Sequence, residues 1–465
     1  MACDLAVQIA STAAERFADF ALGLRYEALP GEVVAAAKHH LLDTVGCGLA
    51  AHALGEGDAG RTVALEGGGS PEASVLGGGA RVPAPAAALA NGMLMHALDF
   101  DDTHADSIAH VSTVVVPAAL AEAEARGADG RALIAALVAG NETTARIGMA
   151  TSGEFHARGF HPTAVAGVFG ATVAAACLAR LDRATATSAL GIAGSMSSGL
   201  FAYLDAGTAT KPIHAGWAAH AGILAARLAA AGAEGPNSVL EGRFGLYDAF
   251  VGRVPDLADS LADLGSRWET TRIAYKPYPA CHFMHGVLGA AETLDTVDPD
   301  EIDDILVAVP DGAVSLVLEP QEQKFAPRTP YEAKFSLQYS LGALLVHGRV
   351  GTGTYLPDAI GDSAVLAVAR RVRYEVRDFP TYPSAFPGAV EIRLRDGGVL
   401  RAELPHQAGG PENPLSDDAI RAKFRDNASL ALGATAVEEL EGALLAIDET
   451  DDLSRALSVL RELPR

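Results

Sequence analysis

The spacing of apolar positions in the first part of the chain is typical of helices. From the start to about Gly265, apolar residues recur at three- and four-residue steps, which place them on one helix face. Glycine, proline or a potential N-cap residue interrupts most of these runs. The pattern predicts helices over five ranges: Val33 to Ala51, Pro83 to Leu98, Ala132 to Ile147, Pro162 to Leu181 and Pro212 to Ala231.

Past residue 268 the period shortens and β-branched residues alternate with polar ones. The segments concerned are WETTRIAYKPYP, DDILVAVP, VRYEVR and AVEIRLRDGGVLRAEL, and the last predicts a hairpin turning at Arg395–Gly398. Helical spacing returns from Ser416 to Leu460. We therefore expect a mainly α protein. A large all-helical domain would be formed by both chain ends (1–269 and 406–465), with a smaller α+β lid domain inserted at 270–405.

The segment LEGGGSPEASVLGGGARVPAPAA is rich in glycine and invites comparison with a phosphate-binding loop. It lacks the strand-then-helix context and the Gly-Lys-Ser/Thr ending that such a loop requires. We interpret it as a surface loop or hairpin.

The net charge of the chain indicates which kinds of binding partner to expect. The formal net charge of −23 repels nucleic acid and anionic lipid, so we expect neither as a partner. An anionic substrate would need a few basic residues gathered in one pocket. Aromatic residues make up only 6%, and alanine and glycine dominate the apolar share, which predicts closely packed helices.

The cysteines and the N-terminus bear on location. The four cysteines lie far apart without a CxxC pair, at Cys3, Cys47, Cys177 and Cys281. That spacing offers no thiolate cluster for an iron–sulfur hydratase. The N-terminal MACDLAVQ carries an acid where a signal peptide needs basic residues, so we expect reduced thiols in the cytoplasm. The uncharged stretch Thr163 to Ala179 is mostly small residues, and we interpret it as a buried helix instead of a membrane span.

The densest polar segment runs from His96 to His104 as HALDFDDTH and continues to His110. It follows an apolar helix and holds four acids and three histidines. Such residues can be metal ligands, but the spacing matches no standard metal motif. Structural capping of the helix end and a metal-free acid–base site are the other two interpretations.

Two helix N-termini carry basic residues. In Gly159-Phe-His-Pro-Thr163, Pro162 suits the first helical position, which makes His161 the N-cap beside free backbone N–H groups. Helix N-termini bind anions such as carboxylates. Lys211 stands just before another predicted helix, where the macrodipole disfavours a cation. A bound anion between Lys211 and the free amides would reverse that penalty, although a tolerated surface lysine fits the pattern as well.

Two further segments lie near the predicted domain junction, where small-molecule sites are common. Tyr275–His285 combines Lys276 with Cys281 and His282, which follow two prolines, and it could equally be a rigid linker. Tyr331–Tyr339 predicts a helical run whose Tyr339 could face the same junction or belong to the core. Across these segments, lysines stand at positions that favour a bound anion, and histidines lie beside them in the sequence. Reactions that form an enolate next to a carboxylate need such a combination of cations and proton-transfer groups.

These segments also resemble a known family. PEASVLGGGARVPAPAAALANG, HALDFDDTH, GFHPTAV, TKPIHAGWAAHAG, YKPYPACHFMH and YEAKFSLQY are similar, in this order, to signatures of the MmgE/PrpD family. The family includes 2-methylcitrate dehydratase, cis-aconitate decarboxylase and iminodisuccinate epimerase. The resemblance covers essentially the whole chain. It implies a helical domain with a smaller lid, a homodimer, an active site in the cleft, and catalysis without metal or cofactor.

The resemblance also implies roles for individual residues. Lys211 and Lys276 would hold substrate carboxylates, His161 with Tyr339 would orient them, and His110 and Asp99 would transfer protons. The candidates for catalysis are His110, Asp99, Lys276, His161, Cys281 and His282. The candidates for substrate binding are Lys211, Tyr339 and His104.

One position departs from the decarboxylase pattern. Animal cis-aconitate decarboxylases resemble Lys-x-Phe-Pro-Ala-His, with a histidine five residues after the lysine as a proposed proton donor. Here that position is Cys281, and His282 follows one step later. The substitution puts specific decarboxylase activity in question.

Four functions therefore stay open. The leading one is a lyase that dehydrates a 2-methylcitrate-like 2-hydroxy acid, with a small anionic polycarboxylate as the substrate. The alternatives within the family are an epimerase of an α-substituted dicarboxylate such as iminodisuccinate and a decarboxylase of cis-aconitate. A non-catalytic helical binding protein is an alternative from another class, and the presence of both lysines with His110 and His161 argues against it.

Overall fold

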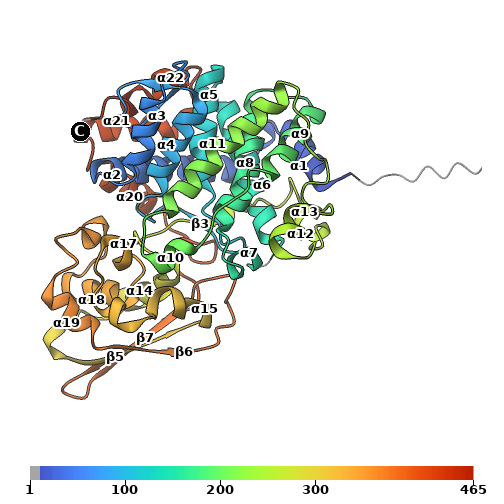
Figure 1. The fold of residues 1–465 in the computed structure, drawn as a ribbon. Coiled ribbons are helices and arrows are strands. Elements are labelled where there is room, and N and C mark those ends of the chain that lie inside the picture. Colours follow the sequence, from blue (N-terminus) through green and yellow to red (C-terminus); the bar gives the residue numbers. More distant parts are fainter. Residues whose placement is uncertain (1–10, 152, 464–465) are drawn as a thin grey trace, which may run out of the picture.

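The computed structural model describes residues 11–151 and 153–463. Figure 1 shows a large helical body, in which the red C-terminal helices lie beside the blue first helices. A smaller part in yellow and orange adjoins this body and contains the only sheet in the described residues with more than two strands. The prediction of a mainly α protein is confirmed. The domain boundaries after residues 269 and 405 stay a prediction.

The helical body is built from sixteen α-helices within the described residues. They are α1 (Ala13–Gly23), α2 (Gly31–Ala53), α3 (Asp58–Glu66), α4 (Ala84–His96), α5 (Ser112–Arg126), α6 (Gly130–Met149), α7 (Glu154–Ala157), α8 (Pro162–Leu178), α9 (Arg183–Gly194), α10 (Ala202–Ala206), α11 (Lys211–Ala230), α12 (Leu246–Val251), α13 (Ala258–Ala262), α20 (Asp417–Ala428), α21 (Ala434–Leu445) and α22 (Leu453–Ala456). The last three, α20, α21 and α22, lie between Ser416 and Leu460, where the sequence returns to helical spacing. Two of them, α20 and α21, pack against α2, so the two ends of the chain share one core.

The five helices predicted from apolar spacing correspond to α2, α4, α6, α8 and α11, each within a few residues of the predicted bounds. Local chemistry explains their ends. Asp129 caps α6 by accepting a hydrogen bond from the backbone N–H of Ala132 at 2.8 Å. His161 is the N-cap of α8, and Pro162 occupies its first turn, as predicted.

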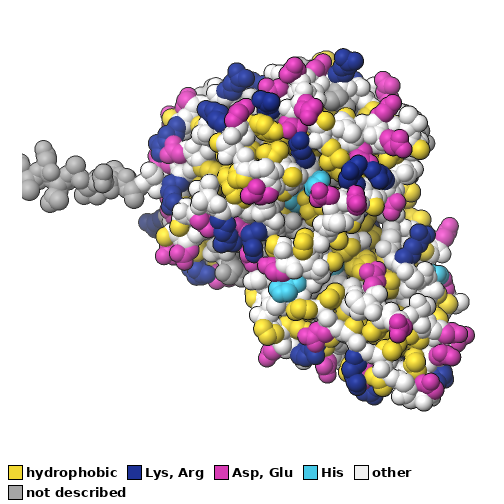
Figure 2. All heavy atoms as spheres, turned by 180° about the vertical axis from the view of Figure 1, so that it is seen from behind, with side chains coloured by type: hydrophobic (Ala, Val, Ile, Leu, Met, Phe, Trp, Pro, Cys, Tyr) yellow, Lys and Arg dark blue, Asp and Glu magenta, His cyan; other side chains and the backbone are white. Residues whose placement is uncertain are grey.

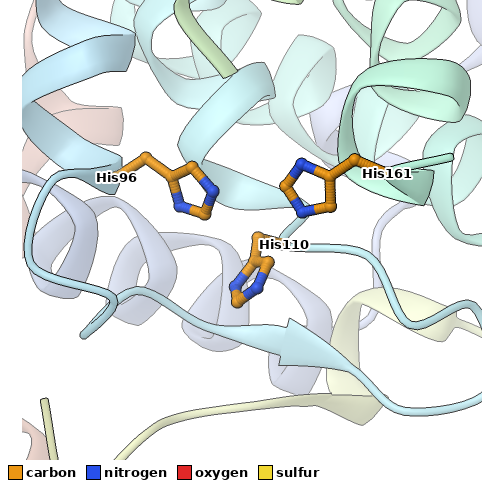
Figure 3. A group of neighbouring side chains, drawn as sticks. All are labelled: His96, His110 and His161. Carbon is orange, nitrogen blue, oxygen red and sulfur yellow. The ribbon is translucent and has the colours of Figure 1, made fainter. Parts of the chain in front are cut away.

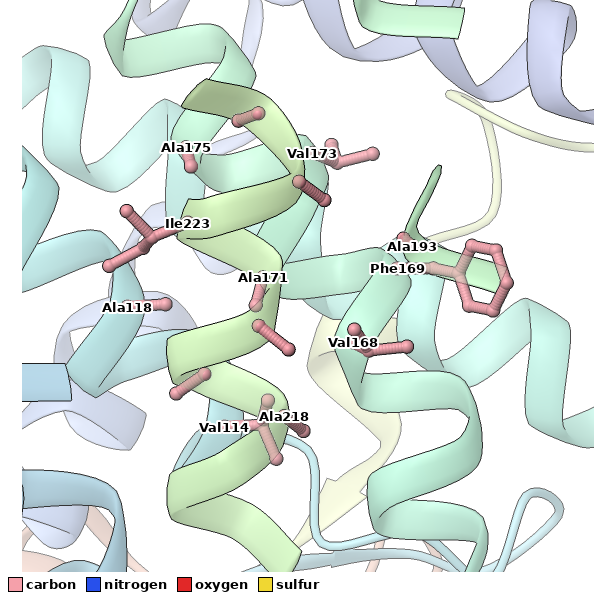
Figure 4. Close-up of a cluster of buried hydrophobic side chains, with 14 of the residues drawn as sticks. Val114, Ala118, Val168, Phe169, Ala171, Val173, Ala175, Ala193, Ala218 and Ile223 are labelled. Carbon is pink, nitrogen blue, oxygen red and sulfur yellow. The ribbon is translucent and has the colours of Figure 1, made fainter. Parts of the chain in front are cut away.

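Small residues let the central helices approach closely, as the composition predicts. A Cβ atom at Gly92 of α4 would lie 2.8 Å from the Cα atom of Gly216 on α11. A Cβ atom at Gly170 of α8 would lie 2.5 Å from the carbonyl oxygen of Gly140 on α6. Figure 4 shows alanine and valine side chains packed among α5, α8, α9 and α11. Backbone contacts of this kind fix the relative positions of α4 and α11, which both lead to the candidate site.

The smaller part is an α+β layer. Its helices are α14 (His285–Glu292), α15 (Asp311–Ala313), α16 (Gln321–Phe325), α17 (Pro330–Ala333), α18 (Leu337–His347) and α19 (Ser363–Ala369). Its strands are β5 (Ile302–Val309), β6 (Val372–Val376), β7 (Gly388–Leu394) and β8 (Val399–Leu404), in the order β6-β5-β7-β8. Only the β5–β6 pair is parallel. The predicted hairpin is β7–β8, and α14 packs on both of these strands.

Three local predictions have clear outcomes. The glycine-rich segment forms a two-stranded antiparallel pair, β1 (Ala73–Ser74) with β2 (Arg81–Val82), so its interpretation as a loop or hairpin is confirmed. The expected strand in WETTRIAYKPYP is reduced to β4 (Ile273–Ala274), because a 3₁₀ turn precedes it and two prolines follow. The single helix expected over Tyr331–Tyr339 was wrong, because Ser336 caps a new helix, α18, through the backbone N–H of Tyr339 at 3.0 Å.

The surface carries both signs of charge. Figure 2 shows acidic and basic side chains interspersed over one face of the molecule. Among the helices of the described residues, none combines the length and the apolar character that a bilayer crossing requires.

Candidate active site

The loop between α4 and α5 carries most of the polar segment identified in the sequence. A two-stranded antiparallel sheet anchors it, with Thr103 of β3 (Thr103–His104) opposite Ala274 of β4. This pairing joins two segments that are far apart in the sequence. It places Lys276, two residues beyond β4, beside the carboxylate of Asp99.

One carboxylate oxygen holds two ammonium groups. The Nζ atoms of Lys276 and Lys211 lie 2.6 Å and 2.9 Å from Oδ1 of Asp99, and Lys276 also donates to the carbonyl oxygen of Asp99 at 2.9 Å. All three side chains are buried. Burial alone would raise the pKa of Asp99, but Lys211 and Lys276 hold it well below its usual range. Asp99 has a φ of +54°, a left-handed conformation that costs free energy in a residue other than glycine and concentrates at functional sites.

Lys211 occupies the first position of α11, with Thr210 as the N-cap. The sequence predicted an anion beside this unfavourably placed cation, and the structure supplies one from the chain itself. Burial works against the charge of Lys211, yet Asp99 raises the pKa of Lys211 above its usual value. The two lysines and Asp99 together leave one net positive charge in a buried place.

Three imidazoles lie beside this group. One ring nitrogen from each of His96, His110 and His161 lies within 4.8 Å of the other two, and Figure 3 shows the three rings facing one another. Burial and the nearby charge of Lys211 lower the pKa of His110 to about 4 and hold the pKa of His161 well below its usual range. Both rings are therefore neutral at pH 7 and are able to accept a proton.

Cys281 and His282 line the same cavity from the smaller part of the protein. Burial raises the pKa of the Cys281 thiol, so this side chain keeps its proton at neutral pH. Burial, with His285 and Lys276, holds the pKa of His282 well below its usual range. Neither ring nitrogen of His282 has a hydrogen-bond partner among the described residues.

Both polar and apolar side chains line the cavity. Its polar lining contains Asp99, Thr103, His110, His161, Lys211, Lys276 and His282, and Cys281 lies among them. Aromatic rings cover the sides, among them Phe201 and Phe335. The lining comes from both the helical body and the smaller part of the protein. Such an enclosed cationic cavity suits a small anion with an apolar backbone.

Comparison with known proteins identifies the lineage. The family model for the MmgE/PrpD N-terminal domain matches residues 15–256, and the model for the MmgE/PrpD C-terminal domain matches residues 278–449. The chain belongs to the MmgE/PrpD family. The resemblance seen in the sequence motifs is thereby confirmed.

Several curated proteins of the family are similar along most of their length. A cis-aconitate decarboxylase-like protein of Aspergillus oryzae is 29% identical over 460 residues, which cover 93% of this chain and 94% of that protein. The human cis-aconitate decarboxylase is 29% identical over 396 residues, covering 82% of this chain and 80% of that enzyme. The decarboxylase of Aspergillus terreus (strain NIH 2624 / FGSC A1156) is 27% identical over 473 residues, covering 95% and 94%. These relatives support a lyase-type activity.

Seven of the nine residues selected from the sequence line the cavity of this MmgE/PrpD protein, namely His110, Asp99, Lys276, His161, Cys281, His282 and Lys211. Two do not. The hydroxyl of Tyr339 points elsewhere and donates to the carbonyl oxygens of Thr354 at 2.8 Å and Ala359 at 3.1 Å. The ring of His104 is buried between Glu269 and Ser107, 3.1 Å and 3.0 Å away. Both side chains therefore lie outside the lining of this cavity, and their contact with the substrate stays a prediction.

The sequence also left out residues that the fold brings into the site. Thr103 and Tyr203 line the cavity, and Asp101 and His96 lie directly behind it. Three of these four belong to the HALDFDDTH segment, which drew attention for its density of polar residues. Spacing could not tell which of its side chains turn toward the cavity, because the segment is an irregular loop.

The cluster includes side chains that are able to hold a metal ion. The two sets are His96 with His110 and His161, and Asp99 with Asp101 and His110. In the second set, Asp99 is already paired with two ammonium groups. The positive charge of these lysines opposes a further cation at this position.

Proposed function

We propose that this protein is a metal-independent lyase that removes a group from a small di- or tricarboxylate by acid–base catalysis. The observation that carries the proposal is the pair of buried lysines on Asp99, which faces neutral imidazoles in one cavity. Two ammonium groups without bulk water favour substrate carboxylates and the enolate-like charge that develops beside them. The family membership and the lyase names of the relatives support the same class.

In the proposed mechanism, Lys211 and Lys276 bind a substrate carboxylate and remain paired with Asp99 at the same time. His110, a neutral base, removes a proton from the adjacent carbon, and the electron pair of that C–H bond moves toward the bound carboxylate. We assign this proton transfer to His110 because both lysines stabilise the ionised form of Asp99 and make it a weak base. His161 lies beside His110, with ring centroids 5.9 Å apart, and orients the substrate.

Dehydration of a 2-methylcitrate-like 2-hydroxy acid is the leading reaction. It needs, besides the base, an acid that protonates the departing hydroxyl group. Cys281 holds its proton at neutral pH and lines the cavity with His282, so this wall is suited to supply that proton. Water leaves with the proton donated by Cys281 or His282. The proton taken by His110 returns to solvent, and the donor regains a proton from solvent, which restores both groups.

Decarboxylation of cis-aconitate is the second candidate, and the names of the similar proteins favour it. Loss of carbon dioxide leaves a carbanion that takes up one proton. The wall of Cys281 and His282 would provide this proton in place of the histidine of the animal decarboxylases. Epimerisation of a substrate such as iminodisuccinate would use the same base and a proton donor on the opposite face of the carbon.

Proton NMR of chelator-treated protein in deuterium oxide distinguishes these reactions. The test acids are 2-methylcitrate, citrate, cis-aconitate and iminodisuccinate. We expect loss of water from the first or second acid. Loss of carbon dioxide from cis-aconitate would favour the second candidate, and deuterium entering an α-carbon without elimination would favour the epimerase. No change in any acid would contradict the proposed function.

The same experiment tests metal independence. We expect the rate after chelation to equal the rate before it, because the lysines supply the positive charge that a metal would provide. Activity that is abolished by the chelator and restored by a divalent ion would contradict this part of the proposal.

A further inference from the structure

Asp101 lies behind the cavity and contacts two imidazoles through one oxygen. Its Oδ2 atom is 2.8 Å from Nδ1 of His96 and 3.3 Å from Nδ1 of His110. Asp101 is fully buried, and His96 is nearly so. Burial alone would raise the pKa of Asp101, but His96 and His110 hold it well below its usual range, so the carboxylate is ionised. Neither residue lines the cavity, and neither has a role in the mechanism above.

The surroundings of His110 determine which of its nitrogens carries the proton. Besides the carboxylate of Asp101, Nδ1 of His110 lies 2.8 Å from the carbonyl oxygen of Asp102 and 3.3 Å from the hydroxyl of Thr103. A carbonyl and a carboxylate only accept hydrogen bonds, so Nδ1 must be the donor. In a neutral ring this leaves the lone pair on Nε2. The backbone N–H of His110 donates to Thr163 at 3.0 Å, which fixes the start of the side chain as well.

His96 has a different function in this arrangement, because it holds Asp101 in place. The Oδ1 atom of Asp101 has no hydrogen-bond partner among the described residues, so the carboxylate is oriented through Oδ2 alone. The ring of His96 packs against those of His110 and His161, with centroids 4.7 Å and 5.7 Å apart. Its Nδ1–H therefore directs the shared oxygen toward His110.

We propose that Asp101 and His96 are positioning residues that hold His110 with its Nε2 lone pair toward the cavity. When His110 takes the substrate proton at Nε2, the ring becomes a cation with both nitrogens protonated. The carboxylate of Asp101 then stabilises the new charge through Nδ1–H, while the electron pair of the broken C–H bond stays on the substrate. The catalytic part of this inference rests on the proposed function, whereas the position of the proton on His110 does not.

The first test is a direct observation of that proton. Long-range proton–nitrogen NMR of protein labelled with ¹⁵N-histidine distinguishes a protonated ring nitrogen from one with a lone pair, and the signals of His110 are assigned by their loss in His110→Asn. We expect Nδ1 protonated and Nε2 free at pH 7. A protonated Nε2 in the native protein would overturn the proposal without any variant or substrate.

The second test compares variants of the two positioning residues. Asp101→Asn should move the proton to Nε2 of His110 in part of the molecules, because an amide presents a donor as well as an acceptor, while the carbonyl of Asp102 keeps Nδ1 protonated in the rest. Its kcat should fall at least ~100-fold with KM changed less than ~3-fold, as expected when only the orientation of the base is lost. His96→Gln keeps an N–H donor for Asp101 and should retain more activity than His96→Phe.

Asp102 and its partner His40 provide a matched control. His40 is equally buried, and its Nδ1 lies 2.8 Å from Oδ2 of Asp102, a carboxylate that does not contact the ring of His110. His40→Gln should lower stability as His96→Gln does and leave the proton on Nδ1 of His110. Unchanged NMR signals and an unchanged kcat in Asp101→Asn would overturn the proposal. If the native protein turns over no acid, the NMR result alone decides the positioning role, and only the proposed function fails.

Discussion

Asp99 holds its negative charge between two buried ammonium groups, and this sharing distinguishes the site from an ordinary ion pair. A single lysine on one carboxylate would be neutral overall and would have little attraction for an anion. Two lysines carry one positive charge more than Asp99 balances in a place without bulk water, and the ionised carboxylate of Asp101 lies behind them. Interactions with a substrate carboxylate are strong there because the effective dielectric constant is low.

Replacing either lysine with methionine tests this account. Lys211→Met and Lys276→Met should each lower kcat/KM at least ~10-fold, as expected for a charge-assisted contact that contributes ~1.5–3 kcal/mol. Steady-state kinetics with the acid identified by NMR provides the measurement. Lys423 is the matched control, because it is also buried and pairs with Asp43 at 2.8 Å but does not line this cavity. Full activity in both lysine variants would contradict the assignment.

The wall formed by Cys281 and His282 raises a separate question about the proton donor. His282 has two buried ring nitrogens without partners among the described residues, which makes it available to a substrate. We expect His282→Asn to lower kcat at least ~100-fold, at the lower end of the range for a lost acid or base. Cys281→Ser keeps a protonated group at its position and should lose less.

Measurement of kcat for both variants decides which residue matters more. A larger loss in Cys281→Ser than in His282→Asn would assign the donor role to the thiol. The alkylation rate adds an independent check. Because burial raises the pKa of Cys281, this thiol should react slowly with iodoacetamide at pH 7.

At the scale of elements, the site depends on how α4 and α11 are held against each other. The α4 helix ends at His96 and continues into the loop that carries Asp99, and α11 begins at Lys211. Their glycine contact, between Gly92 and Gly216, therefore sets the distance between the partners of the central ion pair. The β3–β4 pairing does the same for Lys276.

Adding one methyl group at this contact should disturb both stability and activity. In Gly92→Ala, the new Cβ would lie 2.8 Å from the Cα atom of Gly216, so the helices must separate. We expect the free energy of unfolding to fall by ~1–3 kcal/mol in denaturant titrations, with a lower kcat as well. Gly442 is exposed on α21 with no atom within 4 Å of an added Cβ. Gly442→Ala should raise the free energy of unfolding by ~0.5–1 kcal/mol, and equal effects in the two variants would contradict this account.

At the scale of the whole molecule, a set of buried neutral histidines links stability to pH. Among the described residues, burial lowers the pKa of seven imidazoles, which are His39, His110, His156, His161, His214, His282 and His285. For His110, His156 and His214 the folded pKa is about 4, against an ordinary value of 6.5. Between these values the unfolded chain binds more protons than the folded one, so stability rises with pH.

Thermal unfolding should therefore depend strongly on pH on the acid side. We expect Tm at pH 5 to be at least ~5 °C below Tm at pH 7.5. Each such imidazole binds a proton in the unfolded chain at pH 5, which lowers the free energy of unfolding by about 1–2 kcal/mol. His285→Gln, outside the cavity wall, should reduce this dependence. A Tm that stays constant or rises on acidification would contradict the burial of neutral rings.

The predictions of a homodimer and of a cytoplasmic location also belong to this scale, and both stay predictions. Analytical ultracentrifugation of the purified protein tests the first. We expect a sedimentation mass of twice the 47.8 kDa of one chain. A monomer that is fully active would show that the site is complete within one chain.

The sequence by itself determined the helical class, the major helices and most members of the site. Apolar residues at helical spacing predict helices because the stripe they form must be buried, whatever packs against it. The six ordered motifs identified the family, and lysine and histidine at helix N-termini marked where an anion would be bound. These features depend on neighbours within a few positions in the chain.

The tertiary structure alone decided which polar side chains meet. Asp99 and Lys276 are brought together by the β3–β4 pairing, a contact between segments about 170 residues apart that no local pattern encodes. Tyr339 does not line the cavity, since the carbonyl oxygens of Thr354 and Ala359, 15 and 20 residues further along the chain, accept its hydrogen bond. Tertiary contacts also place Asp101 and His96 behind His110, which no periodic pattern shows. Asp101 lies in an irregular loop, and His96 is the last residue of α4.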